Sequence, residues 1–181
     1  MGRVLAKRGL VAHPGSEAPP ISIGTKLMML SRDVLRIEYA LTGELDRVVI
    51  PPSVIGDRAD GLWQHTCFEA FIRVPGVGYV EHNYSPSENW AAYRFDGYRE
   101  GMQPAYPSPY IHVERDDGRL GLTAYVELGA LSAWPDAIGL SAVIEEANGT
   151  KSYWALKHPP GKPDFHHPDC FALELPAPVR P

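Results

Sequence analysis

Hydrophobic and polar residues alternate along much of this chain with the two-residue period of a β-strand. The alternation is clearest in residues 67–74 and 79–85. One face of the first segment carries apolar side chains and the other is mixed: Phe68, Ala70, Ile72 and Val74 against Cys67, Glu69, Phe71 and Arg73. In the second segment, Tyr79, Glu81, Asn83 and Ser85 share a face. The pattern predicts two neighbouring strands with one apolar face and one face that carries charged and amide groups.

Further short strands are predicted on both sides of this pair. The segments with strand-like patterns are 34–41, 47–50, 90–95, 110–115, 120–126, 138–145, 152–157 and 171–175. Asp117-Gly118 and Asn148-Gly149 are dipeptides that tight hairpin turns favour. One turn at 128–133 is the helix candidate. Roughly nine to eleven short strands with little helix predict an all-β fold, and we favour an antiparallel two-sheet β-sandwich over a barrel.

Composition excludes some classes of function. With 181 residues, 44% of them hydrophobic, the chain is expected to form a single domain, 1–181, with an ordinary core. The net charge of −5 argues against nucleic acid as a partner. Neither a membrane-spanning run of roughly 18 apolar residues nor a signal peptide is evident, so we expect no membrane association and a cytoplasmic location. The two cysteines are then expected to be reduced thiols.

The mixed face of the predicted sheet is the candidate binding site. If segments 67–74, 79–85 and 90–95 are consecutive neighbours, one patch collects acids, bases and an amide: Glu69, Arg73, Glu81, Asn83 and Arg94. Such groups bind the hydroxyls of a polar ligand through paired hydrogen bonds, and Trp63 or Trp90 could provide a stacking wall. The alternative is a hydrated sheet face on which Glu69–Arg94 and Glu81–Arg73 are cross-strand ion pairs.

Several blocks of residues, in the same order, resemble the DOMON-like domains, the superfamily that includes the family 9 carbohydrate-binding modules. The blocks are residues 63–71, then Tyr79-x-Glu81-x-Asn83-x-Ser85-Pro86-Ser87-x-x-Trp90, then Phe95-x-x-Tyr98-Arg99, and finally Tyr153-Trp154-Ala155-Leu156-x-His158-Pro159 with Pro163-Asp164-Phe165-His166 and Phe171. The resemblance implies a β-sandwich that binds a ligand, which is a sugar in the carbohydrate-binding branch and haem in some redox branches. The chain is most similar to a small branch of stand-alone bacterial proteins, for which a small sugar or sugar derivative is the implied ligand.

Metal and haem are two further alternatives. Zinc uses residues such as His65 and Cys67, or His166, His167 and Cys170, but their spacing matches no common zinc pattern and we expect no metal. Haem would need axial ligands, for which Met102 with His112 or His158 could be proposed. No haem-attachment motif is present, so we expect no cofactor.

Catalysis is the remaining alternative, with Glu69 and Glu81 as a carboxylate pair that flanks a glycosidic bond. A general acid needs a raised pKa, whereas Arg73 and Arg94 are expected to hold both carboxyls ionised. The motifs of serine hydrolases, phosphate-binding loops and dinucleotide-binding folds are missing. The sequence therefore favours a non-catalytic module that binds a small polar ligand, above all a carbohydrate, over a haem module or a glycan-acting enzyme.

Overall fold

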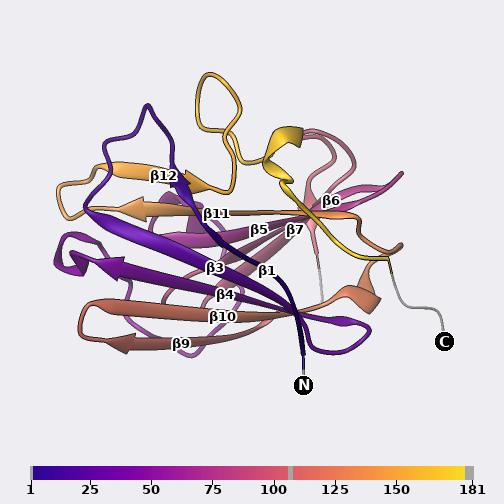
Figure 1. Ribbon diagram of the computed structural model, residues 1–181, viewed down its shortest axis with the longest axis horizontal. Coiled ribbons are helices and arrows are strands. Elements are labelled where there is room, and N and C mark those ends of the chain that lie inside the picture. Colours follow the sequence, from indigo (N-terminus) through magenta and orange to yellow (C-terminus); the bar gives the residue numbers. More distant parts are fainter. Residues whose placement is uncertain (1, 106–107, 178–181) are drawn as a thin grey trace.

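Two antiparallel sheets face each other in the computed structural model, which describes residues 2–105 and 108–177 (Figure 1). In spatial order, the first sheet contains β1 (Arg3–Gly9), β3 (Ile21–Met29), β4 (Val34–Gly43), β10 (Arg119–Glu127) and β9 (Tyr110–Asp116). The second contains β2 (Val11–Ala12), β12 (Lys151–Ala155), β11 (Ala137–Glu145), β5 (Cys67–Val74), β6 (Gly78–Tyr84), β7 (Trp90–Phe95) and β8 (Gln103–Pro104), and β13 (Leu173–Glu174) also pairs with β11. The predicted all-β sandwich is confirmed, with thirteen strands in the described residues.

The first strands of the chain were not predicted. On β3, Ile21, Ile23 and Leu27 face inward, but the inward position between Ile23 and Leu27 holds the polar residue Thr25, which interrupts the apolar pattern. The edge strand β1 lies mostly exposed or half-buried, so it lacks the pattern of buried residues that marks a strand in the sequence.

Short 3-10 helices take the place of some predicted elements. They are η1 (Leu45–Arg47), η2 (Leu62–Gln64), η3 (Leu128–Ala130) and η4 (Pro168–Cys170), and the described residues contain no α-helix. The strand predicted at 47–50 is wrong, because the chain there forms the end of η1 and an isolated bridge between Val48 and Glu146. The helical turn predicted at 128–133 is η3.

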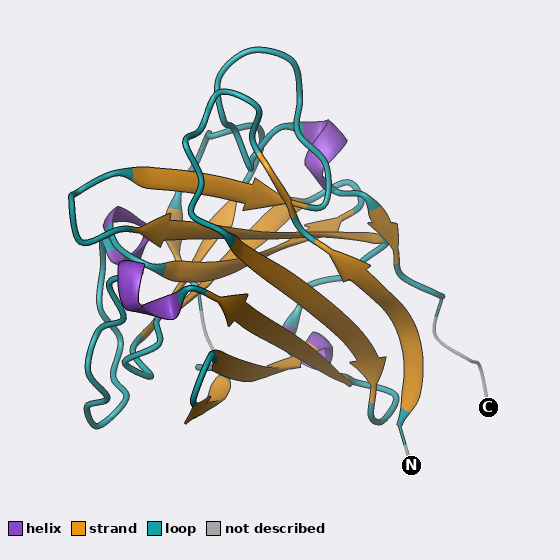
Figure 2. Ribbon diagram, turned by 60° about the vertical axis from the view of Figure 1, so that its left-hand side comes forward, coloured by secondary structure: helices purple, strands orange, loops and turns teal. Residues whose placement is uncertain are grey.

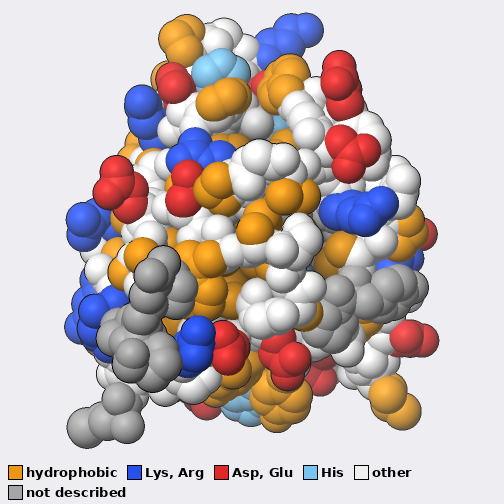
Figure 3. Space-filling model, turned by 90° about the vertical axis from the view of Figure 1, so that its right-hand side faces the viewer, with side chains coloured by type: hydrophobic (Ala, Val, Ile, Leu, Met, Phe, Trp, Pro, Cys, Tyr) orange, Lys and Arg blue, Asp and Glu red, His pale blue; other side chains and the backbone are white. Residues whose placement is uncertain are grey.

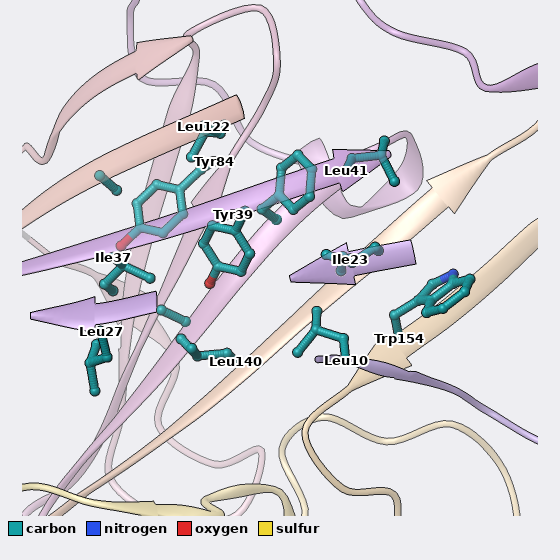
Figure 4. Close-up of a cluster of buried hydrophobic side chains, with 14 of the residues drawn as sticks. Leu10, Ile23, Leu27, Ile37, Tyr39, Leu41, Tyr84, Leu122, Leu140 and Trp154 are labelled. Carbon is teal, nitrogen blue, oxygen red and sulfur yellow. The ribbon is translucent and has the colours of Figure 1, made fainter. Parts of the chain in front are cut away.

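The inner faces of the sheets form one hydrophobic core, part of which Figure 4 shows. Ile37, Tyr39 and Leu41 of β4 point into it from the first sheet, and Phe68 and Ala70 of β5 belong to it from the second. The Tyr39 hydroxyl donates a hydrogen bond of 2.7 Å to the backbone oxygen of Glu69. This bond joins the two sheets directly behind a residue of the candidate site.

The outer face of the second sheet carries a smaller hydrophobic cluster instead of lying open to water. Its buried members are Phe71, Tyr79, Ala91, Tyr93, Phe95, Val143, Ala155 and Phe165. The segment 157–171 loops over this side of the sheet after β12 (Figure 2). At Gly139 on β11, a Cβ atom would lie only 2.6 Å from the backbone oxygen of Cys170, so glycine is what lets this segment approach the sheet so closely.

The surface is mixed in character. On the face that Figure 3 shows, basic, acidic and apolar side chains are interspersed. None of the helices in the described residues is long and apolar enough to cross a membrane.

Candidate functional site

The register of β5, β6 and β7 brings the predicted acids to one face of the second sheet. Glu69 pairs with Asn83, and Glu81 pairs with Phe71 on one side and Tyr93 on the other. Because paired residues in adjacent strands point to the same side, these side chains all project outward, away from the central core. The strand parity predicted for Glu69, Glu81 and Asn83 is confirmed.

A cavity of about 540 Å³ lies over this face. Strands β5, β6, β7, β11 and β12 contribute to it together with η2, the loop after β7 and the segment 157–171. The lining combines carboxyl, basic and aromatic side chains: Trp63, Gln64, Glu69, Glu81, Tyr93, Phe95, Arg99, Met102, Val143, Lys151, Tyr153, Pro163, Phe165 and His166. The hydrated flat face that was the alternative to a binding site is therefore not what the chain forms.

Glu69 is a deeply buried acid, with 2% of its surface exposed. Its carboxyl accepts one long hydrogen bond, from Ser141 Oγ to Oε2 at 3.4 Å. Burial raises the pKa of Glu69 well above its ordinary value, and the neighbouring Glu81 raises it further. The protonated, neutral form of this carboxyl is favoured as a result.

Glu81 lies beside it on the next strand, with 6% of its surface exposed. Asn83 Nδ2 donates a hydrogen bond of 2.9 Å to Glu81 Oε1. Burial raises the pKa of Glu81 to about 7, against the opposing effects of the Asn83 bond and the positive charge of Arg99. Near neutral pH this carboxyl can therefore gain or lose a proton.

Asn83 is fully buried between these two acids. While its Nδ2 holds Glu81, its Oδ1 accepts no hydrogen bond from any residue that the structure describes. The amide group of Asn83 therefore orients the Glu81 carboxyl.

His166 faces Glu81 from the segment 157–171, with Nε2 3.6 Å from Glu81 Oε2. Its Nδ1 lies 2.7 Å from the Tyr79 hydroxyl, which also accepts a hydrogen bond of 3.1 Å from the backbone N–H of Arg99. Burial lowers the pKa of His166 to about 4, so the ring is neutral at pH 7. A neutral imidazole carries one proton, so one of its two nitrogens donates and the other accepts.

Arg99 connects the loop after β7 to the segment 157–171. Its Nη2 lies 2.8 Å from Asp164 Oδ1, and Tyr98 donates a hydrogen bond to the same carboxylate. Arg99 adopts a left-handed backbone conformation with φ of 56°, which is uncommon for a residue other than glycine. The ion pair therefore ties together two loops that line the cavity, at a position where the backbone is constrained.

Arg99, Asp164 and His166 were not predicted as members of this site. The signal was present, because Tyr98-Arg99 and Pro163-Asp164-Phe165-His166 belong to the blocks that resemble the DOMON-like domains. No strand pattern could assign them to the site, since both lie in loops.

Trp63 lines the cavity as predicted for a stacking wall, and 40% of its surface is exposed. Its ring meets the Tyr93 ring edge-on, with 6.2 Å between centroids. Helix η2 holds it there, starting from Gly61, whose φ of 77° is left-handed. Trp63 is thus a partly exposed aromatic surface at the edge of the cavity.

Three other predicted residues are not brought into the site. Trp90 and Arg94 pair with Tyr84 and Val80, so they point to the opposite face of the sheet from Glu81. Arg94 donates a hydrogen bond of 2.6 Å to Gln103. Arg73 shares the outer face but pairs with Asp136 at 2.8 Å, outside the cavity lining.

These positions also correct the ion pairs considered from the sequence. Neither Glu69–Arg94 nor Glu81–Arg73 forms among the described residues. Strand parity excludes Arg94 from the outer face of the sheet. On β7 it points to the same side as Trp90 and to the opposite side from Tyr93, which pairs with Glu81. The expectation that both arginines hold the glutamates ionised is therefore wrong.

The residues considered for a metal or haem have other partners. His65 Nδ1 lies 2.8 Å from Glu145, and the Cys170 thiol donates to the backbone oxygens of Lys157 and Asp164. No group of three or more His, Cys, Asp and Glu side chains in the described residues is arranged to hold a metal ion. Met102 lines the cavity, whereas His112 lies on β9 of the other sheet.

No family model and no curated protein matches the chain. Among solved structures, a candidate carbohydrate-binding protein from Bacteroides uniformis ATCC 8492 matches with a TM-score of 0.64 and 13% identity, over 92% of this chain and 84% of that one. A family 9 carbohydrate-binding module from Caldicellulosiruptor kristjanssonii matches in complex with cellotriose (TM-score 0.47, 9% identity) and with glucose (TM-score 0.46, 10% identity). These two matches cover 89% of this chain and 74% and 76% of the modules.

The likeness to the Bacteroides protein confirms the sandwich fold that the sequence resemblance implied. At 13% identity it extends to the fold alone, so the chemistry of the site has to be argued from the residues of this chain.

Proposed function

We propose that the protein binds a small polar ligand, a carbohydrate or a sugar derivative, in the cavity over β5, β6 and β7. The observation that carries this proposal is the combination of an aromatic wall with buried carboxyl groups in one hollow. Carboxyl groups exchange hydrogen bonds with the hydroxyls of a sugar, and aromatic rings cover its apolar C–H faces. Glu69, Glu81 and Arg99 are the proposed polar contacts, Asn83 orients Glu81, and Trp63 is the proposed stacking surface.

The size of the cavity and the shared fold support this proposal. A volume of about 540 Å³ falls within the range of roughly 300–1,000 Å³ that is usual for small-molecule sites. The Bacteroides protein with the same fold is described as a candidate carbohydrate-binding protein.

Isothermal titration calorimetry with a panel of mono- and disaccharides tests the proposal. We expect saturable binding, weakened by about tenfold in Trp63→Ala, because removal of the ring gives up apolar contact worth roughly 1.5 kcal/mol. Arg94→Ala is the matched control: it removes a large side chain from the other face of the same sheet and should leave affinity unchanged. A panel in which no saccharide binds, or equal losses in both variants, would refute the proposal.

One observation favours a second candidate function, acid–base catalysis on a glycan by Glu69 and Glu81. Burial raises the pKa of both carboxyls, Glu81 to about 7, and a raised pKa is what a general acid needs near neutral pH. Arg73 and Arg94 bind Asp136 and Gln103 instead of these carboxyls, so neither arginine keeps them ionised.

Turnover separates the two functions. A catalytic site predicts release of nitrophenol from nitrophenyl glycosides at a rate that Glu69→Gln or Glu81→Gln lowers by at least about a hundredfold. A binding site predicts binding of the sugar with no turnover above that of buffer.

A further inference from the structure

The two acids in the cavity lack a basic partner. Among the ion pairs of the described residues, no lysine or arginine comes within 4.0 Å of either carboxyl; the partner nearest to Glu81 is His166, at 3.6 Å. Glu69 has one long hydrogen bond, and Glu81 has one from Asn83. The positive charge of Arg99 lowers the pKa of both acids from beyond ion-pair distance, but by less than burial raises it. A buried carboxylate without a cation in contact is costly, so these groups keep acceptor capacity and lack a contacting counter-charge.

The bases in the lining do not supply that charge. Arg99 Nη2 is engaged with Asp164 at 2.8 Å, and this carboxylate already neutralises it. Lys151 lines the cavity from β12, and none of the ion pairs of the described residues joins it to Glu69 or Glu81. Neither cation is therefore in contact with these acids, and the place of a cation next to Glu69 and Glu81 is open to a ligand.

The walls of the cavity suit a cation as well. The lining contains five aromatic residues, namely Trp63, Tyr93, Phe95, Tyr153 and Phe165. The faces of such rings attract an ammonium group electrostatically, and the attraction is strongest where water is excluded. Aromatic walls together with unpaired acids are a combination typical of sites for amines.

We propose that the ligand of this cavity carries a protonated amino group, as an amino sugar does, and that the ammonium group lies against Glu69 and Glu81. This inference rests on the proposed function, because it names the class of small polar ligand that the same site prefers. Sugar hydroxyls would still meet Arg99 and the aromatic walls, while the ammonium group would replace the missing counter-charge.

Proton release is a consequence of this arrangement. Burial raises the pKa of Glu81 to about 7 and that of Glu69 above its ordinary value, so the empty site holds protons at pH 6. A nearby cation favours the ionised form of a carboxyl, so a cationic ligand displaces protons when it binds. A neutral sugar provides no such charge and should release none.

Three sugars with the same ring test the proposal: glucosamine, glucose and N-acetylglucosamine, titrated at pH 6 by isothermal calorimetry. We expect glucosamine to bind at least about tenfold more tightly than the other two, because a hydrogen bond to a charged group is stronger than one between neutral groups. Repeating the titration in buffers with different ionisation enthalpies should show proton release for glucosamine alone.

Glu81→Gln tests the role of the acid. The amide oxygen can still accept the Asn83 hydrogen bond, so the variant should fold, while its affinity for glucosamine should fall to that for glucose. Glu114→Gln is the matched control, because it removes one acid from β9 of the other sheet, and it should keep the preference for glucosamine.

The possible outcomes are distinguishable. Equal binding of glucose and glucosamine by the unaltered protein overturns the amine preference and leaves sugar binding in place. The amine preference is also overturned if Glu81→Gln and Glu69→Gln, as single variants, both still bind glucosamine more tightly than glucose. If none of the three sugars binds, this inference fails, whereas the sugar-binding proposal fails only if the whole saccharide panel shows no binding.

Discussion

At the scale of single residues, Glu69 and Glu81 are acids that water hardly reaches. Their exposed fractions are 2% and 6%, and burial favours the neutral form of each. His166 responds to the same burial in the opposite sense, because its neutral form is the deprotonated one. Below pH 7 the floor of the empty cavity is therefore close to uncharged, which lowers the cost of keeping these groups buried.

Stability should depend on pH through Glu81. Its pKa is about 7 in the folded chain and near the ordinary 4.5 when unfolded, so the folded state holds more protons between these values. The free energy of unfolding should therefore decrease as pH rises from about 4.5 through 7, by about 3 kcal/mol at most. Urea unfolding at pH 5 and pH 8 measures the change.

In Glu81→Gln this part of the pH dependence should disappear, leaving the contribution of Glu69, which has the same sign. Glu114 is an exposed acid of the other sheet, so Glu114→Gln should retain the full dependence of stability on pH. An identical loss of stability with pH in the unaltered protein and in Glu81→Gln would contradict the buried position of this carboxyl.

At the scale of elements, strands set the floor of the cavity and loops set its walls. Register places Glu69 beside Asn83 and Glu81 beside Tyr93, and a slip of one residue would turn all of them inward. The loop after β7 and the segment 157–171 are joined by the ion pair between Arg99 and Asp164. Both sets of contacts must form before the aromatic and acidic groups surround one cavity.

Two buried tyrosines provide a matched test of the contact between the sheets. The Tyr39 hydroxyl donates to the backbone oxygen of Glu69, whereas the Tyr84 hydroxyl has no partner among the described residues. We expect Tyr39→Phe to lower the free energy of unfolding by about 1–2 kcal/mol and Tyr84→Phe to leave it unchanged or to raise it slightly. Urea unfolding of the two variants measures this, and equal losses would contradict the assignment.

Gly139 tests the close approach of the segment 157–171 to the sheet. In Gly139→Ala the new Cβ would lie 2.6 Å from the backbone oxygen of Cys170, so the segment has to move, at a cost of about 1–3 kcal/mol. Sugar affinity should fall as well, because His166 and Phe165 belong to this segment. Gly24→Ala on β3, where a Cβ meets nothing within 4 Å, is the control, and a Gly139→Ala protein as stable as this control would refute the argument.

At the scale of the whole molecule, the chain has two hydrophobic clusters with different roles. The larger one lies between the sheets and joins them. The smaller one lies on the outer face of the second sheet and supports the wall of the cavity. Local opening that leaves the larger cluster intact can expose the smaller one, because segments with fewer packed neighbours open at lower free energy.

The reaction rates of the two cysteines distinguish local opening of the covering segment from opening of the sandwich. Both thiols are free and buried, and burial raises the pKa of Cys67 and raises that of Cys170 to about 11, so both should react slowly in the native protein. Cys170 lies in η4 of the covering segment, and Cys67 lies on β5 between β11 and β6. Cys170 should therefore be labelled faster than Cys67.

Mass spectrometry after timed labelling with a thiol reagent compares the two rates, and full labelling of both in urea is the control. Faster labelling of Cys67 than of Cys170 would mean that the sandwich opens before its covering segment does, contrary to this description.

The sequence by itself determined the strands that carry the site and the side to which their residues point. Alternation in residues 67–74 and 79–85 was sufficient for Glu69, Glu81 and Asn83, because parity is a local property of an extended chain. The strands β1 and β3 were not recognised, because the edge strand β1 buries few residues and the polar residue Thr25 interrupts the inward apolar face of β3. Trp63 was identified from the type of residue, and its place at the cavity depends on η2.

Only the tertiary structure decided whether the mixed face is a binding cavity or a hydrated surface. That outcome depends on contacts between distant segments: Arg99 with Asp164, Tyr79 with His166, and Gly139 with Cys170. The same contacts, together with the pairing of Arg73 to Asp136, decide which charges the acids meet and hence the pKa of Glu69 and Glu81. Local patterns hold no information on them, since burial and pairing are properties of the folded whole.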